Sequence, residues 1–238
     1  MSDRAVVLAG GKGTRLRPYT VVFPKPLMPL GDYPILEVIV RQLAAEGFRR
    51  ITLAVNHQAN LIKAFFGDGE QWNVRIDYSV ESEPLSTIAP LCLIEDLPET
   101  FLLMNGDVLT DLSVRRLYDE HVASGCAFTV AASWRTHRVD YGVLKIDAAS
   151  TLVGFEEKPS MQYLVSMGVY VVDKSVLGIV PRGRPYGFDD LMGALVARRD
   201  RVNVRPHDGY WLDLGRPDDY AQAVEEFDRL RDVLLRHA

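Results

Sequence analysis

The sequence predicts an α/β protein with a Rossmann-like, mostly parallel sheet flanked by helices. Apolar runs of strand length alternate with helix-length amphipathic segments through the first half of the 238 residues. The first run, Ala5–Leu8, leads directly into a glycine-rich turn, and open α/β sheets bind ligands where their strands end. A composition of 47% hydrophobic and 25% charged residues is typical of one ordinary globular domain.

Alternation of strands and helices defines the first half of the chain. Apolar residues 35, 36, 39 and 43 share one face of a predicted helix, and Gly47 can end that helix in a left-handed conformation. The predicted strands are 5–8, 51–55, 74–78, 101–104 and 127–132, and the predicted helices are 35–46, 58–66, 88–95 and 112–124.

The second half contains short strands with few helices between them. This pattern predicts an antiparallel addition that forms the wall receiving a second substrate. The predicted strands are 142–146, 152–156, 165–172, 202–205 and 211–213, and the helices are 189–198 and one from Pro217. We expect one domain, 1–238, without a C-terminal β-helix.

Charge and cysteine content exclude several classes of protein. The net charge of −5 and pI near 5.6 give no basic excess for nucleic acid. Cys92 and Cys126 lie in apolar runs and are predicted to be buried, and neither belongs to a C-x-x-C pair. The histidines are scattered, which argues against zinc. The N-terminus resembles neither a signal peptide nor a membrane span, so we expect a cytoplasmic protein.

The glycine-rich turn is the strongest chemical signal. Gly10, Gly11 and Gly13 follow the first strand, and their backbone N–H groups can form a concavity that binds anions. The cations Arg15, Arg17 and Lys25 follow, and such cations favour a polyphosphate. The spacing is neither that of a Walker A loop nor G-x-G-x-x-G.

This stretch, L-A-G-G-K-G-T-R-L-R-P followed by P-K-P, resembles the signature of the sugar-1-phosphate nucleotidyltransferases, in a short single-domain form. The resemblance implies a nucleotide-binding half, 1–132, and a sugar-binding half, 133–238, which includes the C-terminal helix. It implies catalytic roles for Arg15 and Lys25. It also implies nucleotide binding by the loop residues Leu8, Ala9, Gly10, Gly11, Gly13 and Thr14.

Two aspartates match the metal-binding segments of that family. Asp107 in Asn105-Gly106-Asp107 follows a strand, and Asp213 stands in W-L-D-L-G, where Arg216 replaces a common threonine. Two carboxylates with phosphates and water suit Mg²⁺, so the resemblance implies Mg²⁺ on Asp107 and Asp213. Asp107 could otherwise be a turn residue, and Asp213 a helix N-terminal acid.

The resemblance also implies residues that bind the sugar phosphate. Glu157 and Lys158 belong to an E-E-K-P segment that would hold the sugar hydroxyls and phosphate, although an E-E-K run is otherwise a solvated patch. Ser166 replaces an asparagine of the family pattern, which puts one hydrogen bond to the sugar in doubt. The implied set is Asn105, Gly142, Glu157, Lys158, Ser166 and Gly168.

The loop expected near the base departs from the family pattern. Ser86 and Ala89 stand where the usual P-L-G-T-A-G has glycines, so either the base sits differently or the nucleotide preference has shifted. Glu81 could accept hydrogen bonds from the N1–H and N2–H₂ edge of guanine, or it could be an exposed loop acid. The implied nucleotide-binding residues here are Glu81, Ser86 and Thr87.

The implied reaction converts a nucleoside triphosphate and a sugar 1-phosphate to a nucleotide sugar and pyrophosphate. Guanylyl transfer to mannose or heptose 1-phosphate is the first expectation. The alternatives are uridylyl or thymidylyl transfer to glucose or amino-sugar 1-phosphates, and cytidylyl transfer to phosphocholine or a phosphonate. A catalytically silent regulator that binds nucleotide sugars is the alternative of another class. Relatives are often dimers or tetramers, so a homo-oligomer is a further expectation.

Overall fold

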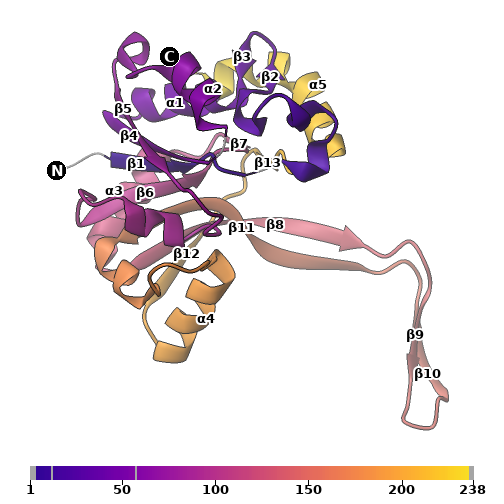
Figure 1. The fold of residues 1–238 in the computed structure, drawn as a ribbon. Helices are drawn as coiled ribbons and strands as arrows, with labels where there is room; N and C mark the ends of the chain where they lie inside the picture. Colours follow the sequence, from indigo (N-terminus) through magenta and orange to yellow (C-terminus); the bar gives the residue numbers. More distant parts are fainter. Residues whose placement is uncertain (1–3, 12, 57, 236–238) are drawn as a thin grey trace.

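A mixed seven-stranded sheet forms the centre of the protein in a computed structural model that describes residues 4–11, 13–56 and 58–235 (Figure 1). Its order is β12-β8-β11-β6-β1-β4-β5. Neighbouring strands are parallel except β11, which is antiparallel to β6 and β8. The strands are β1 (Arg4–Leu8), β4 (Arg50–Val55), β5 (Arg75–Val80), β6 (Thr100–Asn105), β8 (Phe128–Arg138), β11 (Ser160–Asp173) and β12 (Val202–Pro206).

Both faces of this sheet are covered by other elements, and side chains along the central strands therefore alternate between two cores. Ala5 and Val7 of β1 belong to the larger core, and Val6 belongs to the smaller one. The larger core receives α1 (Ile35–Ala45), α2 (Ala59–Phe66), α3 (Val114–Ser124) and α5 (Pro217–Leu234), and the smaller core receives α4 (Phe188–Arg198). This arrangement confirms the predicted fold class.

Two short sheets complete the body. β7 (Val108–Thr110) pairs with β13 (Trp211–Asp213), and β2 (Pro29–Leu30) pairs with β3 (Tyr33–Pro34). In the described part of the chain, no helix combines the length and apolar character that crossing a membrane requires.

Two local predictions from the sequence were wrong. The helix expected over 88–95 is only a short 3₁₀ helix, Ala89–Leu93. The helix ends at Leu93 because the next residue, Ile94, has an extended backbone conformation with φ −97° and ψ 99°. Cys126 is buried as predicted, but Cys92 is exposed on the outer side of the same short helix.

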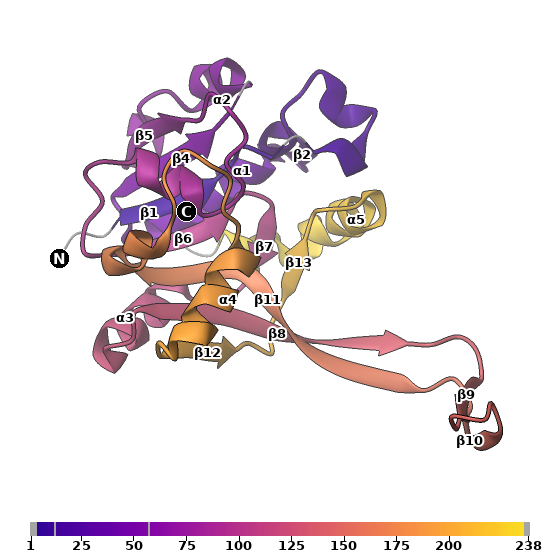
Figure 2. The ribbon, with the colours of Figure 1, turned by 60° about the horizontal axis from the view of Figure 1, so that its bottom comes forward.

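The largest departure from the sequence prediction concerns the second half of the chain. β8 and β11 continue far beyond the predicted 127–132 and 165–172 and leave the body as a two-stranded ribbon (Figures 1 and 2). The hairpin of β9 (Val143–Ile146) and β10 (Leu152–Glu156) lies at its far end. We call residues 134–164 the arm. The predicted antiparallel addition is present, but it projects from the body instead of forming a wall against the sheet.

Candidate active site

The ends of β1 and β6 bring the glycine loop and the Asn105–Asp107 segment together. These strands are parallel neighbours, with Leu8 beside Asn105. The Gly106 N–H donates to the Leu8 carbonyl oxygen at 2.9 Å, and a Cβ on Gly106 would lie only 2.9 Å from that oxygen. Glycine permits this close approach, and the turn brings Asp107 to the edge of the loop.

Pairing of β7 with β13 sets Asp213 next to Asp107. Asp213 stands opposite Val108, and the Leu214 N–H donates to the Asp107 carbonyl oxygen at 3.0 Å. Burial raises the pKa of Asp213, and the negative charge of Asp107 adds to that effect, whereas Lys25 and Arg15 oppose it. The two acids predicted to bind metal therefore share one local electrostatic environment.

The two predicted catalytic cations lie at these acids. Lys25 is only 7% exposed, and its ammonium group donates a hydrogen bond to Asp107 Oδ2. Arg15 Nη2 and Asp213 Oδ1 lie 2.9 and 3.0 Å from the point where a Cβ on Gly215 would stand. Glycine at 215 therefore leaves room for the guanidinium group beside β13. Lys12, within the same loop, lies outside the described residues.

The two carboxylates fit the chemistry of a magnesium site. Asp213 Oδ1 is buried and accepts no hydrogen bond from the described residues, and an unpaired buried carboxylate oxygen is costly. Mg²⁺ prefers one or two protein carboxylates together with phosphates and water. Over the described ranges, no group of three or more His, Cys, Asp or Glu side chains could hold a metal. Phosphate and water oxygens would have to complete the coordination shell.

A cleft of about 1020 Å³ opens beside this charged cluster. It runs along the carboxyl ends of β1, β4 and β6, the edge that open α/β sheets use for ligands. Predicted site residues that line it are Leu8, Gly10, Gly11, Glu81, Ser86, Thr87, Asn105 and Asp107.

Three predicted loop residues do not line the cleft. Ala9 is buried and donates its N–H to the Ala54 carbonyl oxygen. Gly13 adopts φ 58°, and its carbonyl oxygen accepts a hydrogen bond from Thr20 Oγ1 at 2.6 Å. Thr14 begins a 3₁₀ turn, Thr14–Leu16, and is exposed. Ala9 and Gly13 therefore shape the loop.

Glu81 lies directly against the glycine loop. A Cβ on Gly10 would stand 2.9 Å from Glu81 Oε1, so a larger residue there would displace this carboxylate. The other carboxylate oxygen, Oε2, accepts the Leu85 N–H at 3.1 Å. This bond fixes the carboxylate in the cleft and leaves Oε1 directed toward the loop.

Ser86 keeps the backbone conformation that glycine would adopt. Its φ is 69°, a left-handed conformation that is unfavourable for a residue with a Cβ. Thr87 Oγ1 accepts the Phe188 N–H at 2.9 Å, and the segment Leu85–Ala89 also bonds the backbone of Tyr186. Hydrogen bonds of the residues on both sides of Ser86 therefore keep it in this unfavourable conformation.

Three of the residues predicted to bind the sugar phosphate lie together on the body. Gly168 has φ 74°, and a Cβ there would lie 2.6 Å from Asn105 Nδ2. Ser166 Oγ donates to the Tyr170 hydroxyl at 3.0 Å and accepts the Gly168 N–H at 3.3 Å. The pairing of β11 with β8 is interrupted between Ser166 and Tyr170. This irregularity turns the strand toward Asn105, at the end of the cleft.

The other three lie on the arm and not beside the cleft. A Cβ on Gly142 would meet the Phe155 ring at 2.6 Å and Glu157 Oε2 at 3.3 Å, so Gly142 and Glu157 are neighbours within the arm. Ser160, which follows Lys158 by two residues, is six strand residues from Ser166, a separation of about 20 Å. The structure therefore divides the predicted sugar-binding residues into two groups.

Asn56 is a cleft residue that the sequence analysis did not select. It follows β4 directly, lines the cleft, and its Nδ2 would lie 3.6 Å from a Cβ on Gly10. The sequence could have indicated Asn56, because it is the first polar residue after a buried parallel strand and so lies at the ligand-binding edge of the sheet.

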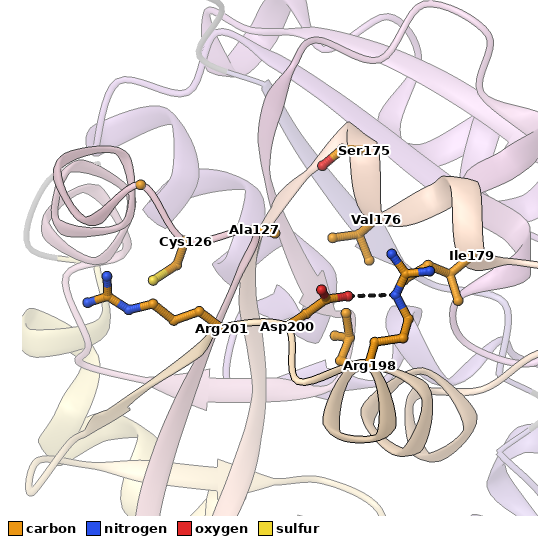
Figure 3. Close-up of a pocket in the computed structure, with 10 residues that line it drawn as sticks. Cys126, Ala127, Ser175, Val176, Ile179, Arg198, Asp200 and Arg201 are labelled. Carbon is orange, nitrogen blue, oxygen red and sulfur yellow. Dashed lines mark hydrogen bonds and ion pairs between the residues drawn. The ribbon is translucent and has the colours of Figure 1, made fainter.

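A second pocket, of about 310 Å³, lies at the opposite end of the sheet (Figure 3). It is formed where β8 and β12 begin, and Cys126, Val176 and Arg201 contribute to its lining. Arg198 Nε donates to Asp200 Oδ2 at 2.8 Å, so this guanidinium is already paired. None of the predicted site residues lines this pocket, and the candidate site is the larger cleft.

Comparison with known proteins gives concordant matches. A family model described as nucleotidyl transferase matches residues 4–229. A mannose-1-phosphate guanyltransferase from Aspergillus oryzae is 34% identical over 227 residues, which cover 91% of this chain and 62% of that protein. A UTP--glucose-1-phosphate uridylyltransferase from Synechocystis is 30% identical, with 93% and 62% covered. The chain thus spans about three fifths of the length of these curated relatives.

A solved structure resembles most of the chain. The crystal structure of HddC from Yersinia pseudotuberculosis complexed with GMP-PN has a TM-score of 0.71 and 25% sequence identity. The match covers 94% of this chain and 99% of HddC.

Proposed function

Because the chain belongs to the nucleotidyl transferase family, we propose that it transfers a nucleotidyl group from a nucleoside triphosphate to a sugar 1-phosphate. The products are a nucleotide sugar and pyrophosphate. Similarity to mannose-1-phosphate guanyltransferases supports a guanine nucleotide, with mannose or heptose 1-phosphate as the acceptor. Similarity to the Synechocystis protein supports uridylyl transfer to glucose 1-phosphate as the second candidate.

One observation carries the proposal: Lys25, Arg15, Asp107 and Asp213 gather beside the cleft that the glycine loop lines. A triphosphate in this cleft would meet the backbone N–H groups of the glycine loop and, beside that loop, the two cations. In this proposal the phosphates of the nucleotide and the entering acceptor meet at this cluster.

The chemistry needs no protein nucleophile. A phosphate oxygen of the sugar 1-phosphate, already anionic, attacks the α-phosphorus of the nucleotide. A new P–O bond forms, the bond from the α-phosphorus to the bridging oxygen breaks, and pyrophosphate leaves with that electron pair. Lys25 and Arg15 would neutralise the charge on the phosphates as it builds in the transition state. The walls of the cleft supply the alignment of the two substrates.

We also propose that Asp107 and Asp213 hold Mg²⁺. The unpartnered, buried Oδ1 of Asp213 supports this assignment. When bound, the ion would screen phosphate charge and orient the phosphate oxygens. Lys25 touches Asp107 and would keep this carboxylate directed toward the phosphates.

Recognition of the base is assigned to Glu81. Its Oε2 is already engaged by the Leu85 N–H, whereas Oε1 faces the loop at Gly10. A carboxylate oxygen accepts from the N1–H and N2–H₂ donors of guanine, and uracil offers only one such donor. Glu157 and Lys158 are assigned to the sugar hydroxyls and the sugar phosphate, as the resemblance implies.

The test is pyrophosphate release with Mg²⁺, crossing GTP, UTP, ATP, CTP and dTTP with mannose, heptose, glucose and N-acetylglucosamine 1-phosphates and phosphocholine. Release with GTP and one hexose or heptose 1-phosphate is expected. A Glu81→Gln variant should lose GTP turnover more than UTP turnover. Nucleotide-sugar binding without release in any pair would contradict the proposed catalysis and favour a regulator.

A further inference from the structure

The arm carries a concentration of uncovered apolar side chains. No residue from 134 to 164 is buried, although the arm contains two pairs of strands. A two-stranded ribbon is marginally stable without a covered face, and large exposed apolar surfaces mark interfaces. The exposed large apolar residues of the arm are Trp134, Tyr141, Leu144, Ile146, Leu152, Val153, Phe155, Met161, Tyr163 and Leu164.

The size of this surface matches that of a stable protein interface. Each of these ten side chains exposes on the order of 100 Å², about half of what a buried aromatic side chain removes from water. One arm therefore presents on the order of 1,000 Å². Two arms covered together would bury about as much as the roughly 1,600 Å² of a standard interface.

A second uncovered apolar surface lies beside the candidate site. Tyr19, Val21, Val22 and Phe23 are between 58 and 69% exposed. This segment is anchored to the glycine loop through the hydrogen bond from Thr20 to Gly13. We call residues 19–23 the apolar loop. One chain therefore carries two apolar surfaces, one on the arm and one beside the cleft. Two copies related by a two-fold axis can cover both, because the arm of each copy can pack on the loop of the other.

The site itself lacks the groups that the arm carries. Glu157 and Lys158 are exposed, and no hydrogen bond or ion pair joins either of them to the described residues. Lys158 is held at φ 46°, an unfavourable conformation for a lysine, and such strain is typical of functional positions. At this end of the cleft the body contributes Asn105, Ser166 and Gly168, and the nearby Lys25 is already paired with Asp107.

We propose that two copies of this chain form a two-fold dimer by exchanging arms. Each arm packs against the apolar loop of the other copy and carries Glu157 and Lys158 into the acceptor end of that copy's cleft. Each complete site is then built from two chains. The assignment of these two residues to the sugar phosphate rests on the proposed function, whereas the dimer itself does not.

The first test is molar mass by sedimentation equilibrium at micromolar concentration. The wild type should have twice the chain mass. Leu144→Asp on the arm and Phe23→Asp on the apolar loop should each give monomers, because either change buries a charge in the interface. Val196→Asp, at a valine on α4 that is even more exposed than Leu144 and Phe23, is the control and should stay dimeric. A monomeric wild type, or a dimer that neither interface variant splits, would overturn the proposal.

The second test is complementation between two inactive variants. Asp107→Asn removes a body group, and Lys158→Ala removes an arm group. After subunit exchange in an equal mixture, half of the dimers are mixed, and each mixed dimer has one intact site. About a quarter of the wild-type specific activity should return, while each variant alone stays inactive. Arms that serve their own chain would restore none, and that result would overturn the exchange.

These tests separate failure of the dimer from failure of the proposed function. A wild type that releases no pyrophosphate in any substrate pair refutes the proposed activity, whatever its mass. In that case the proposed exchange of arms is tested by the molar mass of the variants alone. Splitting of the dimer by both Leu144→Asp and Phe23→Asp still supports the exchanged interface, and an unchanged mass overturns it.

Discussion

The body and the arm differ in how their residues are held. In the body, β1 is hydrogen-bonded on both sides, and residues 4–7 are buried. In the arm, β9 and β10 are also paired but bury no side chain. The nucleotide end of the candidate site is therefore rigid within one chain. In the proposed dimer the acceptor end is completed by a ribbon that its own chain leaves uncovered, and substrate specificity is then coupled to assembly.

The largest expected effect tests whether catalysis resides in the body. Lys25→Ala should lower kcat on the order of 10²- to 10³-fold, the usual cost of removing one preorganised group that stabilises transition-state charge. KM for the sugar 1-phosphate should change only a few-fold. Lys145→Ala on the arm is the matched control, because among the described residues Lys145 forms its ion pair with the exposed Glu156. Steady-state kinetics would contradict the assignment if Lys25→Ala kept its kcat.

The next effect separates stability from activity within the body. Asp213→Asn should abolish turnover but raise the melting temperature in chelator by about 2–4 °C, the shift expected for about 1 kcal/mol. The reason is that an uncompensated buried carboxylate oxygen is replaced by a neutral amide.

Asp218→Asn provides the control for this comparison. Asp218 lies in the first turn of α5, where a negative charge favours the helix. Its replacement should lower the melting temperature slightly and leave activity intact. A lower melting temperature for Asp213→Asn, measured by calorimetry, would show that this carboxylate has a stabilising partner and would contradict the inference from the orphan oxygen.

The body was predictable from the sequence because its signals are local. Gly106 is required by a contact with the Leu8 carbonyl, and the strand before it is a continuous apolar run. The meeting of Asp107 with Asp213 is different, because it arises from pairing of β7 with β13 across about a hundred residues. No periodicity reveals that pairing, and only the family resemblance indicated it.

The arm was not predictable for a physical reason. Residues 134–138 mix apolar and charged side chains without the alternation of a strand with one buried face. They are extended because residues 160–164 pair with them. A ribbon exposed on both faces leaves no pattern of burial in the sequence. The separation of Glu157 and Lys158 from the cleft therefore appears only in three dimensions.

Two glycine substitutions compare how well the body and the arm tolerate an added Cβ. Gly168→Ala should destabilise the protein by about 1–3 kcal/mol, because the residue has φ 74° and a Cβ would meet Asn105. It should also raise KM for the sugar 1-phosphate. Gly154→Ala should be neutral within about 0.5 kcal/mol, because its Cβ meets only the flexible Lys145 side chain at 3.4 Å. Denaturant unfolding of both variants measures this difference in stability. Equal losses of unfolding free energy in the two variants would contradict the prediction.

The smallest expected effect lies at the far edge of the body, where β1 begins. Arg4 is buried and donates to Asp96 at 2.8 Å, and Arg50 also contacts that carboxylate. The hydrogen bond from Arg4, followed by that from Arg50, lowers the pKa of Asp96 to about 2. A lowered carboxyl pKa adds stability above the unfolded value, near about 4, and this stability is lost as the pH falls toward about 2.

Asp96→Asn should therefore be less stable than the wild type at neutral pH and converge with it between about pH 5 and pH 2. The difference should be no more than about 1 kcal/mol, because the Asp96 side chain is 57% exposed and solvent screens its charge. High salt should reduce the difference further. Free energies of unfolding from urea titrations across this pH range provide the measurement. Curves for the two proteins that stay parallel down to pH 2 would show that Asp96 does not contribute through its charge.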